Sequence, residues 1–435
     1  PGEYMEAYYK QFYNYAFYKK GMTREQANQW ANDNFITNSN FGLQYNPYTI
    51  PTGENLIGLD GKLNPKATLG RMYEYNGKKF YILPDNWKDA AYRHGFRQEY
   101  NVNISGGDSK ISYYSSIGYL KEKGVLENSG YERFTARLKA DYQATDWLHL
   151  LANASYVHAD RESNPNLSNT NSNASNLGYF TQYISPIYPI YVRTIDANGN
   201  PVIATDRFGH PQYDFGVPAT NFQGLNGRPF SQTGNPLGSN RYNKVNDILD
   251  QLQGQLNFDI TFTPWLKFNS TNSITLILSR FSHYENPFIG NAAATNGSID
   301  KYTDVSYRWN YVQTLNAHKV FGLHDVQLMI GHEWYKMNKN FLEALARGGF
   351  SPAIQEINAF ADRYNSYSYQ RNYNVEGYFA NFLYNFDQKY FAQASYRRDA
   401  SSRFAKKNRW GDFWSIGGAW IISKEKFFQN LNTKW

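Results

Sequence analysis

The eight histidines are the first residues to test for chemistry, because imidazole serves both as a metal ligand and as an acid–base group. They are scattered along the chain, and His332-Glu333 alone resembles a zinc motif. In that motif the fourth residue after the first histidine is a second ligand, but here it is Lys336. His149 and His332 fall in alternating segments, where a position in a β-strand wall is favoured over metal binding.

Other catalytic patterns are also missing from the sequence. There is no nucleophile elbow, no phosphate-binding loop of the Walker type and no glycine-rich dinucleotide motif. Carboxylates are plentiful, so a glycosidase pair stays open, although no two stand out as sharing an apolar pocket. The chain has no cysteine, which excludes disulfides and cysteine-based zinc sites. The sequence therefore favours a protein that is not an enzyme.

One segment resembles half of a calcium-binding loop. Asp196-Ala-Asn198-Gly199-Asn200 supplies oxygen ligands, but the glycine at position six and the terminal glutamate are missing. An Asn-Gly turn in a β-hairpin explains the same residues without a metal. We expect the turn, and we predict neither a metal site nor a cofactor, with calcium left as the open alternative.

Composition indicates where such a chain would lie. Aromatic residues make up 18% of its 435 residues, yet the mean hydropathy is −0.68 and no apolar run of about 18 residues occurs. This combination is typical of strands that present one face to lipid and the other to water. The net charge of +7 is modest and its basic residues are dispersed, so nucleic-acid binding is not predicted.

Sustained period-two alternation is the strongest structural signal. Between 251 and 262, Leu252, Leu256, Phe258, Ile260 and Phe262 share one face, opposite a row of amides and carboxylates. Related patterns predict about eleven strands, with the length of about 9–11 residues that crosses a bilayer. A soluble β-sandwich or propeller is the alternative, but its strands are usually about 5–6 residues long.

The connections between these strands alternate in length. Short turns are predicted at 107–110, 145–147, 263–265, 321–325 and 387–389, and longer excursions at 122–130, 160–250, 280–301, 340–368 and 400–411. This habit is typical of outer-membrane barrels, which have short periplasmic turns and long extracellular loops. The sequence therefore predicts an all-β, antiparallel transmembrane β-barrel.

The polar faces of the strands would then line the barrel lumen. The residues predicted to face it are Arg133, Arg137, Lys139, Asp141, Gln253, Gln255, Asn257 and Asp259.

Two regions lack the strand pattern and are placed outside the cell. Residues 1–95 include a helical stretch at 3–34, where Thr23 to Gln26 resembles a capping box that begins a second helix. The second region, 160–250, is rich in Asn, Ser, Gly and Pro. Its aromatic residues are candidates for contact with a ligand or a lid, although such rings also pack on one another: Tyr179, Phe180, Tyr183, Tyr188, Tyr191, Phe208 and Tyr213.

Two long stretches resemble one known family. The first includes Pro84-Asp-Asn-Trp87-Lys-Asp, then Gln98-Glu-Tyr-Asn-Val-Asn-Ile-Ser-Gly106-Gly107 and Tyr131-Glu-Arg-Phe-Thr-Ala-Arg. The second is Tyr396-Arg-Arg-Asp399-Ala-Ser-Ser-Arg403-Phe-Ala-Lys-Lys-Asn408-Arg-Trp-Gly411-Asp-Phe-Trp-Ser415. Both resemble the SusC/RagA family of TonB-dependent outer-membrane transporters of Bacteroidota. Ala405 and Trp414 depart from the family pattern, where Gly and Pro are common.

The resemblance implies a barrel of roughly 22 strands around an N-terminal plug. It also implies a SusD-like lipoprotein lid and import driven by the TonB complex acting on the plug. On this interpretation residues 96–435 form about half of the barrel, and the plug and the distal strands are not in this chain. The charged loop motif is expected to form a charge network that orders an outer loop rather than to bind ligand: Arg398, Asp399, Ser402, Arg403, Asn408 and Arg409.

The expected function is active import of an oligosaccharide or oligopeptide across the bacterial outer membrane. The expected partners are the lid lipoprotein, the TonB complex, the transported substrate, and outer-membrane lipid and lipopolysaccharide. A passive porin or adhesin-type barrel is one alternative, and a soluble glycan-binding β-protein is the other.

Overall fold

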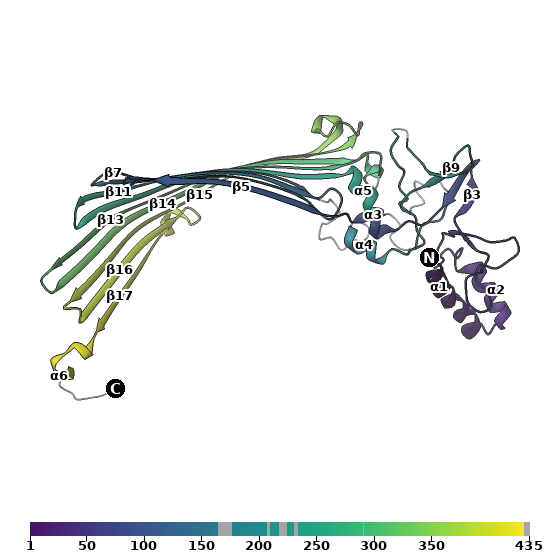
Figure 1. The fold of residues 1–435 in the computed structure, drawn as a ribbon, viewed down its shortest axis with the longest axis horizontal. Coiled ribbons are helices and arrows are strands. Elements are labelled where there is room, and N and C mark those ends of the chain that lie inside the picture. The colour runs from purple at the N-terminus through teal and green to yellow at the C-terminus, as the bar shows by residue number, and fades with distance from the viewer. Residues whose placement is uncertain (164–175, 207–208, 217–223, 230–233, 290, 430–435) are drawn as a thin grey trace.

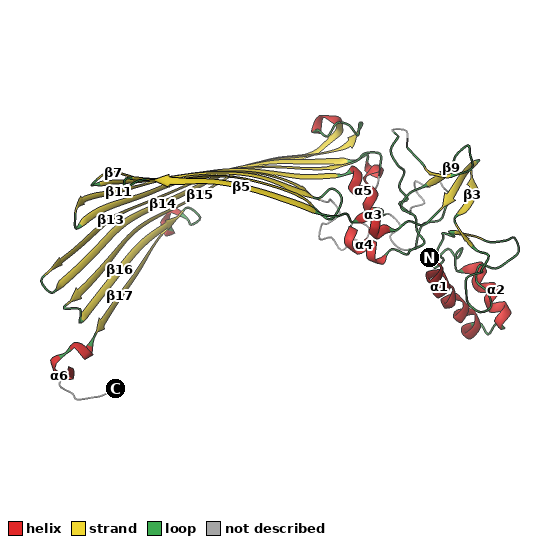
Figure 2. Cartoon of the chain, in the orientation of Figure 1, coloured by secondary structure: helices red, strands yellow, loops and turns green. Residues whose placement is uncertain are grey.

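The computed structural model describes residues 1–163, 176–206, 209–216, 224–229, 234–289 and 291–429. Its main feature is an 11-stranded sheet in the order β17-β16-β15-β14-β13-β12-β11-β8-β7-β6-β5, in which every neighbouring pair is antiparallel (Figures 1 and 2). The strands are β5 (Phe96–Gly107), β6 (Ile111–Lys123), β7 (Gly130–Thr145), β8 (Leu148–Ser163), β11 (Lys244–Thr263), β12 (Leu266–Glu285), β13 (Ser298–Phe321), β14 (His324–Gly349), β15 (Phe360–Phe386), β16 (Tyr390–Ser401) and β17 (Trp410–Trp420). Each of these strands pairs with the next one in the order of the chain, which confirms the predicted antiparallel strands.

The two faces of this sheet differ in chemistry, as the alternation predicts. Side chains that lie directly opposite each other on paired strands point to the same face. One row across the sheet joins Leu138, Ala154, Gly254, Ile274 and Trp309. The neighbouring positions Lys139, Asn153, Gln255 and Ser273 form a polar row on the other face. An apolar face against lipid and a polar face against water satisfy both environments.

The strands extend further than the alternation predicts. The predicted excursion at 340–368 shrinks to a connection between the end of β14 at Gly349 and the start of β15 at Phe360. The predicted excursion at 280–301 likewise loses residues to β12 and β13. Beyond a bilayer both faces of a strand meet water, so period-two hydrophobicity disappears while backbone pairing continues. The predicted loop boundaries were wrong there for this reason.

The short turns lie where the sequence predicts them. Asp387 and Gln388 both have positive φ, of 53° and 49°, which is the conformation of the two central residues in a type I′ hairpin turn. Trp147 and Trp265 lie at two other turns, and their side chains are 53% and 42% exposed. Exposed indole rings at this level suit the aromatic girdle at a membrane–water interface.

A second body of structure lies beyond the opposite ends of the strands (Figure 1). It contains α1 (Gly2–Asn14), α2 (Arg24–Asn34), α3 (Trp87–Ala91), α4 (Leu177–Tyr183) and α5 (Pro236–Tyr242), with a π-helical turn at Tyr15–Lys19. It also contains a small sheet of β3 (Arg71–Tyr75), β4 (Lys78–Ile82), β9 (Arg193–Ile195) and β10 (Pro201–Ile203), and the pair β1 (Tyr48–Thr49) and β2 (Thr68–Leu69). Short 3-10 helices at Asn291–Thr295, Ile357–Ala359, Lys406–Asn408 and Ile422–Lys424, and α6 (Lys426–Gln429), complete the elements.

The predicted helices and hairpin are present in this body. Thr23 caps α2: its hydroxyl accepts a hydrogen bond from the Gln26 amide, and the Gln26 side chain accepts one from the Thr23 amide. Asp196 to Asn200 form the turn between β9 and β10, with Gly199 at a φ of 84°, as the hairpin interpretation requires. No helix in the described part of the chain is long and apolar enough to cross a membrane.

Candidate functional site

The polar face of the sheet carries all eight residues predicted to line the lumen. Arg137, Ser155 and Gln253 are directly opposite one another on β7, β8 and β11. Asp141, Leu151 and Asn257 form another such row, and the remaining members lie an even number of positions along the same strands. The structure therefore brings the eight residues onto one face, and their exposure to a barrel lumen stays a prediction.

His149 joins three strands on this polar face, close to the short turn that follows β7. Its Nε2 lies 2.8 Å from Asp141 Oδ1 on β7, and its Nδ1 lies 3.0 Å from Asp259 Oδ2 on β11. Asn269 on β12 donates a further hydrogen bond of 2.6 Å to Asp259. The two carboxylates bind opposite edges of the imidazole ring and do not converge on a shared point. His149 is therefore a wall residue that links strands, as the sequence predicts.

Arg397 is the centre of a second polar cluster, and it was missed among the predicted site residues. Its guanidinium lies 2.8 Å from Glu333 on β14 and 2.8 Å from Asp399 on its own strand, β16. It also lies 5.4 Å from the ring centre of Phe379, on the intervening strand β15. The period-two rule holds the signal that could have found it, because Arg397 and Asp399 share a face whereas Arg398 does not.

The charged loop motif does not form the single network that was predicted. Arg398 lies on the face opposite Asp399, where it stacks 5.2 Å from the ring centre of Trp410 and lies 3.7 Å from Asp412. Ser402 and Asn374 exchange hydrogen bonds of 2.9 Å. Within the loop, Arg403 lies over the ring of Tyr373, Arg409 donates to the Phe404 carbonyl, and the Asn408 backbone amide donates to the Ala405 carbonyl.

These contacts show that the predicted charge network was wrong in joining Arg398 to Asp399. Alternation along β16 separates Arg398 from Asp399, so adjacent positions in the motif cannot share one network. The loop contacts nevertheless join backbone and side chains within the loop and to β15, which is consistent with an ordering role. No ligand contact follows from them.

The predicted contact aromatics of the long loop divide into buried and exposed rings. Phe180 and Tyr188 are completely buried, and Tyr213 is 8% exposed. Tyr191 packs against Tyr213 at a ring distance of 4.9 Å. Among the described members of this set, only Tyr179 and Tyr183 are well exposed, and their rings stack at 4.3 Å on α4. Phe208 lies outside the described residues.

The buried rings belong to a shared loop core, formed where residues 1–95 pack against the described residues between 176 and 243. Its members include Met5, Phe35, Trp87, Phe180 and Tyr188. The Tyr188 hydroxyl donates a 3.0 Å hydrogen bond to the Leu43 carbonyl, and Phe180 packs 4.9 Å from Trp87. These rings thus stabilise the loop core in this structure, and Tyr179 and Tyr183 remain as the candidates for contact with a ligand or lid.

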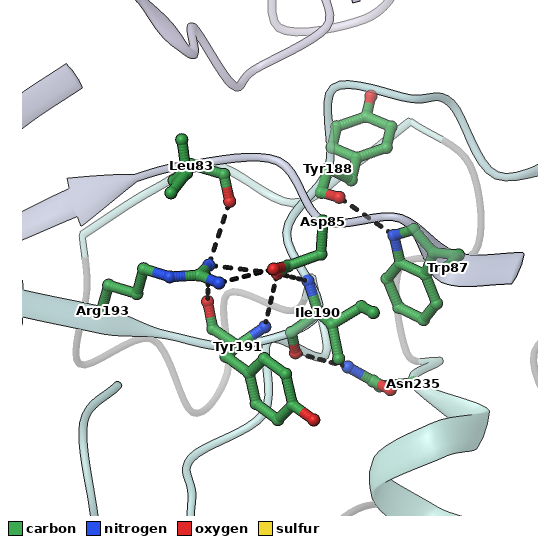
Figure 3. A network of polar contacts seen from close by, with 8 residues as sticks. All are labelled: Leu83, Asp85, Trp87, Tyr188, Ile190, Tyr191, Arg193 and Asn235. Carbon is green, nitrogen blue, oxygen red and sulfur yellow. Dashed lines mark hydrogen bonds and ion pairs between the residues drawn. The ribbon is translucent and has the colours of Figure 1, made fainter. Parts of the chain in front are cut away.

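A polar network fixes the two segments of the loop core to each other (Figure 3). Asp85 accepts hydrogen bonds from the backbone amides of Ile190 and Tyr191 and forms an ion pair with Arg193. Arg193 also donates to the Leu83 carbonyl, and Trp87 Nε1 donates to the Tyr188 carbonyl. A largely buried ion pair with this many hydrogen bonds orders the backbone around it.

Comparisons with known proteins agree with this architecture. No family model matches the chain. The chain is 26% identical over 370 residues to the TonB-dependent receptor SusC of Bacteroides thetaiotaomicron, covering 80% of this chain and 33% of that protein. It is also 26% identical over 360 residues to the TonB-dependent receptor P39 of Formosa agariphila, covering 79% of this chain and 30% of that protein. The chain therefore spans about a third of the length of these relatives.

Solved structures support the same fold. The structure of the RagAB peptide transporter superposes with a TM-score of 0.59 at 20% identity, covering 80% of this chain and 36% of that chain. The RagAB peptide importer in its closed-closed state gives 0.58 at the same identity, covering 82% and 38%. At this identity the likeness concerns the fold.

Consecutive antiparallel strands with one apolar and one polar face, together with the likeness to RagAB, give the chain the fold of outer-membrane β-barrel proteins. Its sequence is similar to TonB-dependent receptors such as SusC over four fifths of the chain, which confirms the predicted resemblance.

Proposed function

We propose that the protein containing this chain is a TonB-dependent importer of the bacterial outer membrane, which carries an oligosaccharide or oligopeptide to the periplasm. The observation that carries the proposal is the sequence likeness to TonB-dependent receptors over four fifths of the chain. A sheet with one apolar and one polar face supports it, because such a sheet separates lipid from a water-filled lumen. No enzymatic reaction is proposed.

The partners follow from the same likeness. A SusD-like lipoprotein would cover the extracellular end, a plug in the complete protein would connect to the TonB complex, and the apolar face would contact outer-membrane lipid and lipopolysaccharide. Support for an external partner comes from the loop core, which places a large folded body at the strand ends away from the short turns (Figure 1). The exposed pair Tyr179 and Tyr183 belongs to that body.

Energy coupling separates the proposal from a passive porin. The experiment measures growth and uptake of labelled oligosaccharide and peptide pools in the native bacterium, with the gene intact or deleted. We expect deletion to abolish uptake of one pool, and we expect a protonophore to abolish the same uptake in intact cells. Gene-dependent uptake that continues after collapse of the proton gradient would establish the porin instead.

Fractionation and co-purification test the location and the partner. The full-length protein should require detergent for release from outer membranes, and a lipoprotein should co-purify with it in stoichiometric amounts. Release without detergent would support the soluble glycan-binding alternative. A trapped glycan or peptide, identified by mass spectrometry, would name the class of cargo.

A further inference from the structure

Three exposed cations lie on the polar face of the sheet, in its middle part: Arg137 and Lys139 on β7, and Arg308 on β13. One row of directly paired residues joins Arg137 to Arg308 across five strands, through Ser155, Gln253 and Thr275. Because neighbouring strands are about 4.8 Å apart, the two arginines are about 19 Å apart along the sheet. Lys139 lies in the next row toward the short turns. The cations are thus spread over the face rather than gathered at one point.

The side chains between these cations form hydrogen bonds but carry no charge. Together with the three cations they make a surface that we call the amide wall, and they include Asn103, Ser116, Asn153, Ser155, Gln253, Gln255, Ser273, Thr275 and Asn310. Amide and hydroxyl groups can each donate and accept hydrogen bonds. The amide wall therefore offers many neutral hydrogen-bonding groups and a few positive charges to whatever lies against it.

No carboxylate shares the amide wall with its cations. None of the three cations forms an ion pair with a residue that the structure describes. Arg137 donates a 3.2 Å hydrogen bond from Nε to Asn153, which is neutral. Asp141 is two positions from Lys139 on the same face, but it lies 2.8 Å from His149 instead.

The other acids at the borders of the amide wall also have cations of their own. Glu99 lies 2.7 Å from Arg97, Asp304 lies 2.5 Å from Lys339, Glu333 lies 2.8 Å from Arg397, and Asp247 is directly opposite Arg161. The positive charge of the amide wall is therefore not compensated within the described chain. A surface of one sign that lines a confined, water-filled space concentrates ligands of the opposite sign.

We propose that the amide wall binds an acidic oligosaccharide, with its carboxylate or sulfate groups on Arg137, Lys139 and Arg308. Guanidinium and ammonium groups form strong, charge-assisted hydrogen bonds with such anions. Sugar hydroxyls both donate and accept, so they match the neutral amides and hydroxyls between the cations. Cations that are spread along the sheet suit an extended chain with several acidic sugars. This inference rests on the proposed import function and specifies the cargo for it.

A peptide and a neutral sugar fit the amide wall less well. The residues that pair directly with Arg137 and Lys139 on β6 and β8 are Ser116, Tyr114, Ser155 and Asn153, and Tyr114 alone among these four has a ring. The apolar side chains of a peptide would therefore find few partners there. A neutral sugar would bond to the amides but would leave the cations without an anion.

Titration calorimetry on the full-length transporter, purified in detergent with its co-purifying partner, tests the proposal. The probes are hexagalacturonate, maltohexaose and hexaglutamate. We expect hexagalacturonate to bind, the other two to bind at least about tenfold more weakly, and hexagalacturonate affinity to fall as salt is added. Replacing Arg137→Gln together with Lys139→Gln should raise the Kd for hexagalacturonate about tenfold or more. Arg308→Gln, four strands away, should raise the same Kd independently.

A matched variant removes one lysine and one arginine from the other face. Lys121→Gln with Arg280→Gln should leave the Kd unchanged, since both residues lie in one row of that face. Equal losses in the two double variants, or equal binding of hexagalacturonate and maltohexaose, would overturn the proposal. Tighter binding of hexaglutamate would assign the wall to an acidic peptide instead. An unchanged Kd in the Arg137 and Lys139 variant, with a plug that proteases cut faster, would assign the wall to the plug.

The import function can be judged separately. Should energy-dependent import of another cargo persist after the binding test fails, the import function would stand without this site. Loss of all import with hexagalacturonate binding intact would overturn the import function alone.

Discussion

The indole nitrogen of Trp87 donates a 3.0 Å hydrogen bond to the backbone carbonyl of Tyr188. Both side chains are buried in the loop core, and the two residues belong to segments separated by the four strands β5–β8. This bond therefore fixes α3 against the segment that follows α4.

Removing the donor should loosen the loop core locally. Trp87→Phe retains an aromatic ring but leaves a buried carbonyl unsatisfied, which costs about 1–3 kcal/mol. We expect faster hydrogen exchange and faster proteolysis in residues 176–190. Trp147→Phe is the control, because Trp147 is exposed at a distant turn and should change neither. Unchanged exchange in the Trp87 variant would show that packing alone holds the segments together.

Two adjacent arginines should differ in their effect on stability. Arg397→Met removes ion pairs to both Glu333 and Asp399, leaving two carboxylates on one face without their cation. Because these groups are partly exposed, we expect a loss of about 1–2 kcal/mol. Arg398→Met removes a contact with Asp412 at 3.7 Å on the other face and should cost less. Unfolding of the barrel in detergent, followed by gel mobility after heating, gives the comparison, and the reverse order would contradict the assignment of faces.

Adjacent residues on β11 test which face meets lipid. Leu256 lies on the apolar face and Gln255 on the polar face. An arginine facing lipid near the bilayer midplane costs about 2–4 kcal/mol, so Leu256→Arg should reduce the amount of assembled protein in the outer membrane. Gln255→Arg should assemble nearly normally. Equal tolerance of the two changes would refute a lipid-facing apolar side.

Asp300 should give stability an unusual dependence on pH. Burial and the neighbouring Glu343 raise its pKa from 3.8 to about 6, so the folded protein keeps a proton that the unfolded chain releases. Stability therefore falls as pH rises through this window, and the loss is complete above about pH 7. Asp300→Asn should be more stable than the wild type at pH 7.5, by about 1–2 kcal/mol, and equal to it near pH 3. Asp304→Asn should instead lose stability at pH 7.5, because Asp304 pairs with Lys339. Thermal unfolding in detergent at the two pH values decides between these outcomes.

Period-two alternation was enough to predict the sheet, because each spanning strand must present opposite chemistry to lipid and to water. The same rule placed Gln253 and Arg137 on one face without any knowledge of register. A separate local signal, the capping box of Thr23 and Gln26, predicted the start of the second helix. Features that depend on neighbouring residues in sequence, or on a single strand, could therefore be predicted from the sequence.

Features that depend on pairing between distant strands could not be predicted from the sequence. Arg397 meets Glu333, 64 positions earlier in the chain, only because β14, β15 and β16 have a particular register. Polar residues at the far ends of β13 and β14 were hidden for another reason. Asp300 and Glu343 come from strand ends that were predicted as loop, since both faces there meet water and alternation fades. The buried rings of the loop core follow no period at all, so Phe180 and Tyr188 could not be told from Tyr179 and Tyr183.

The loop core joins residues that lie far apart in the sequence, and this affects the order of folding. The hydroxyl of Tyr45 donates to Asp214, 169 positions away, and Ser185 donates to Tyr4 across 181 positions. Between each pair lie β5–β8, whose own contacts are mostly between consecutive strands. Closing so long a chain segment is slow unless the intervening strands have already brought its ends together. Hairpin pairing should thus come first and the loop core last, which makes a completed core a marker of chains that have already formed this part of the wall.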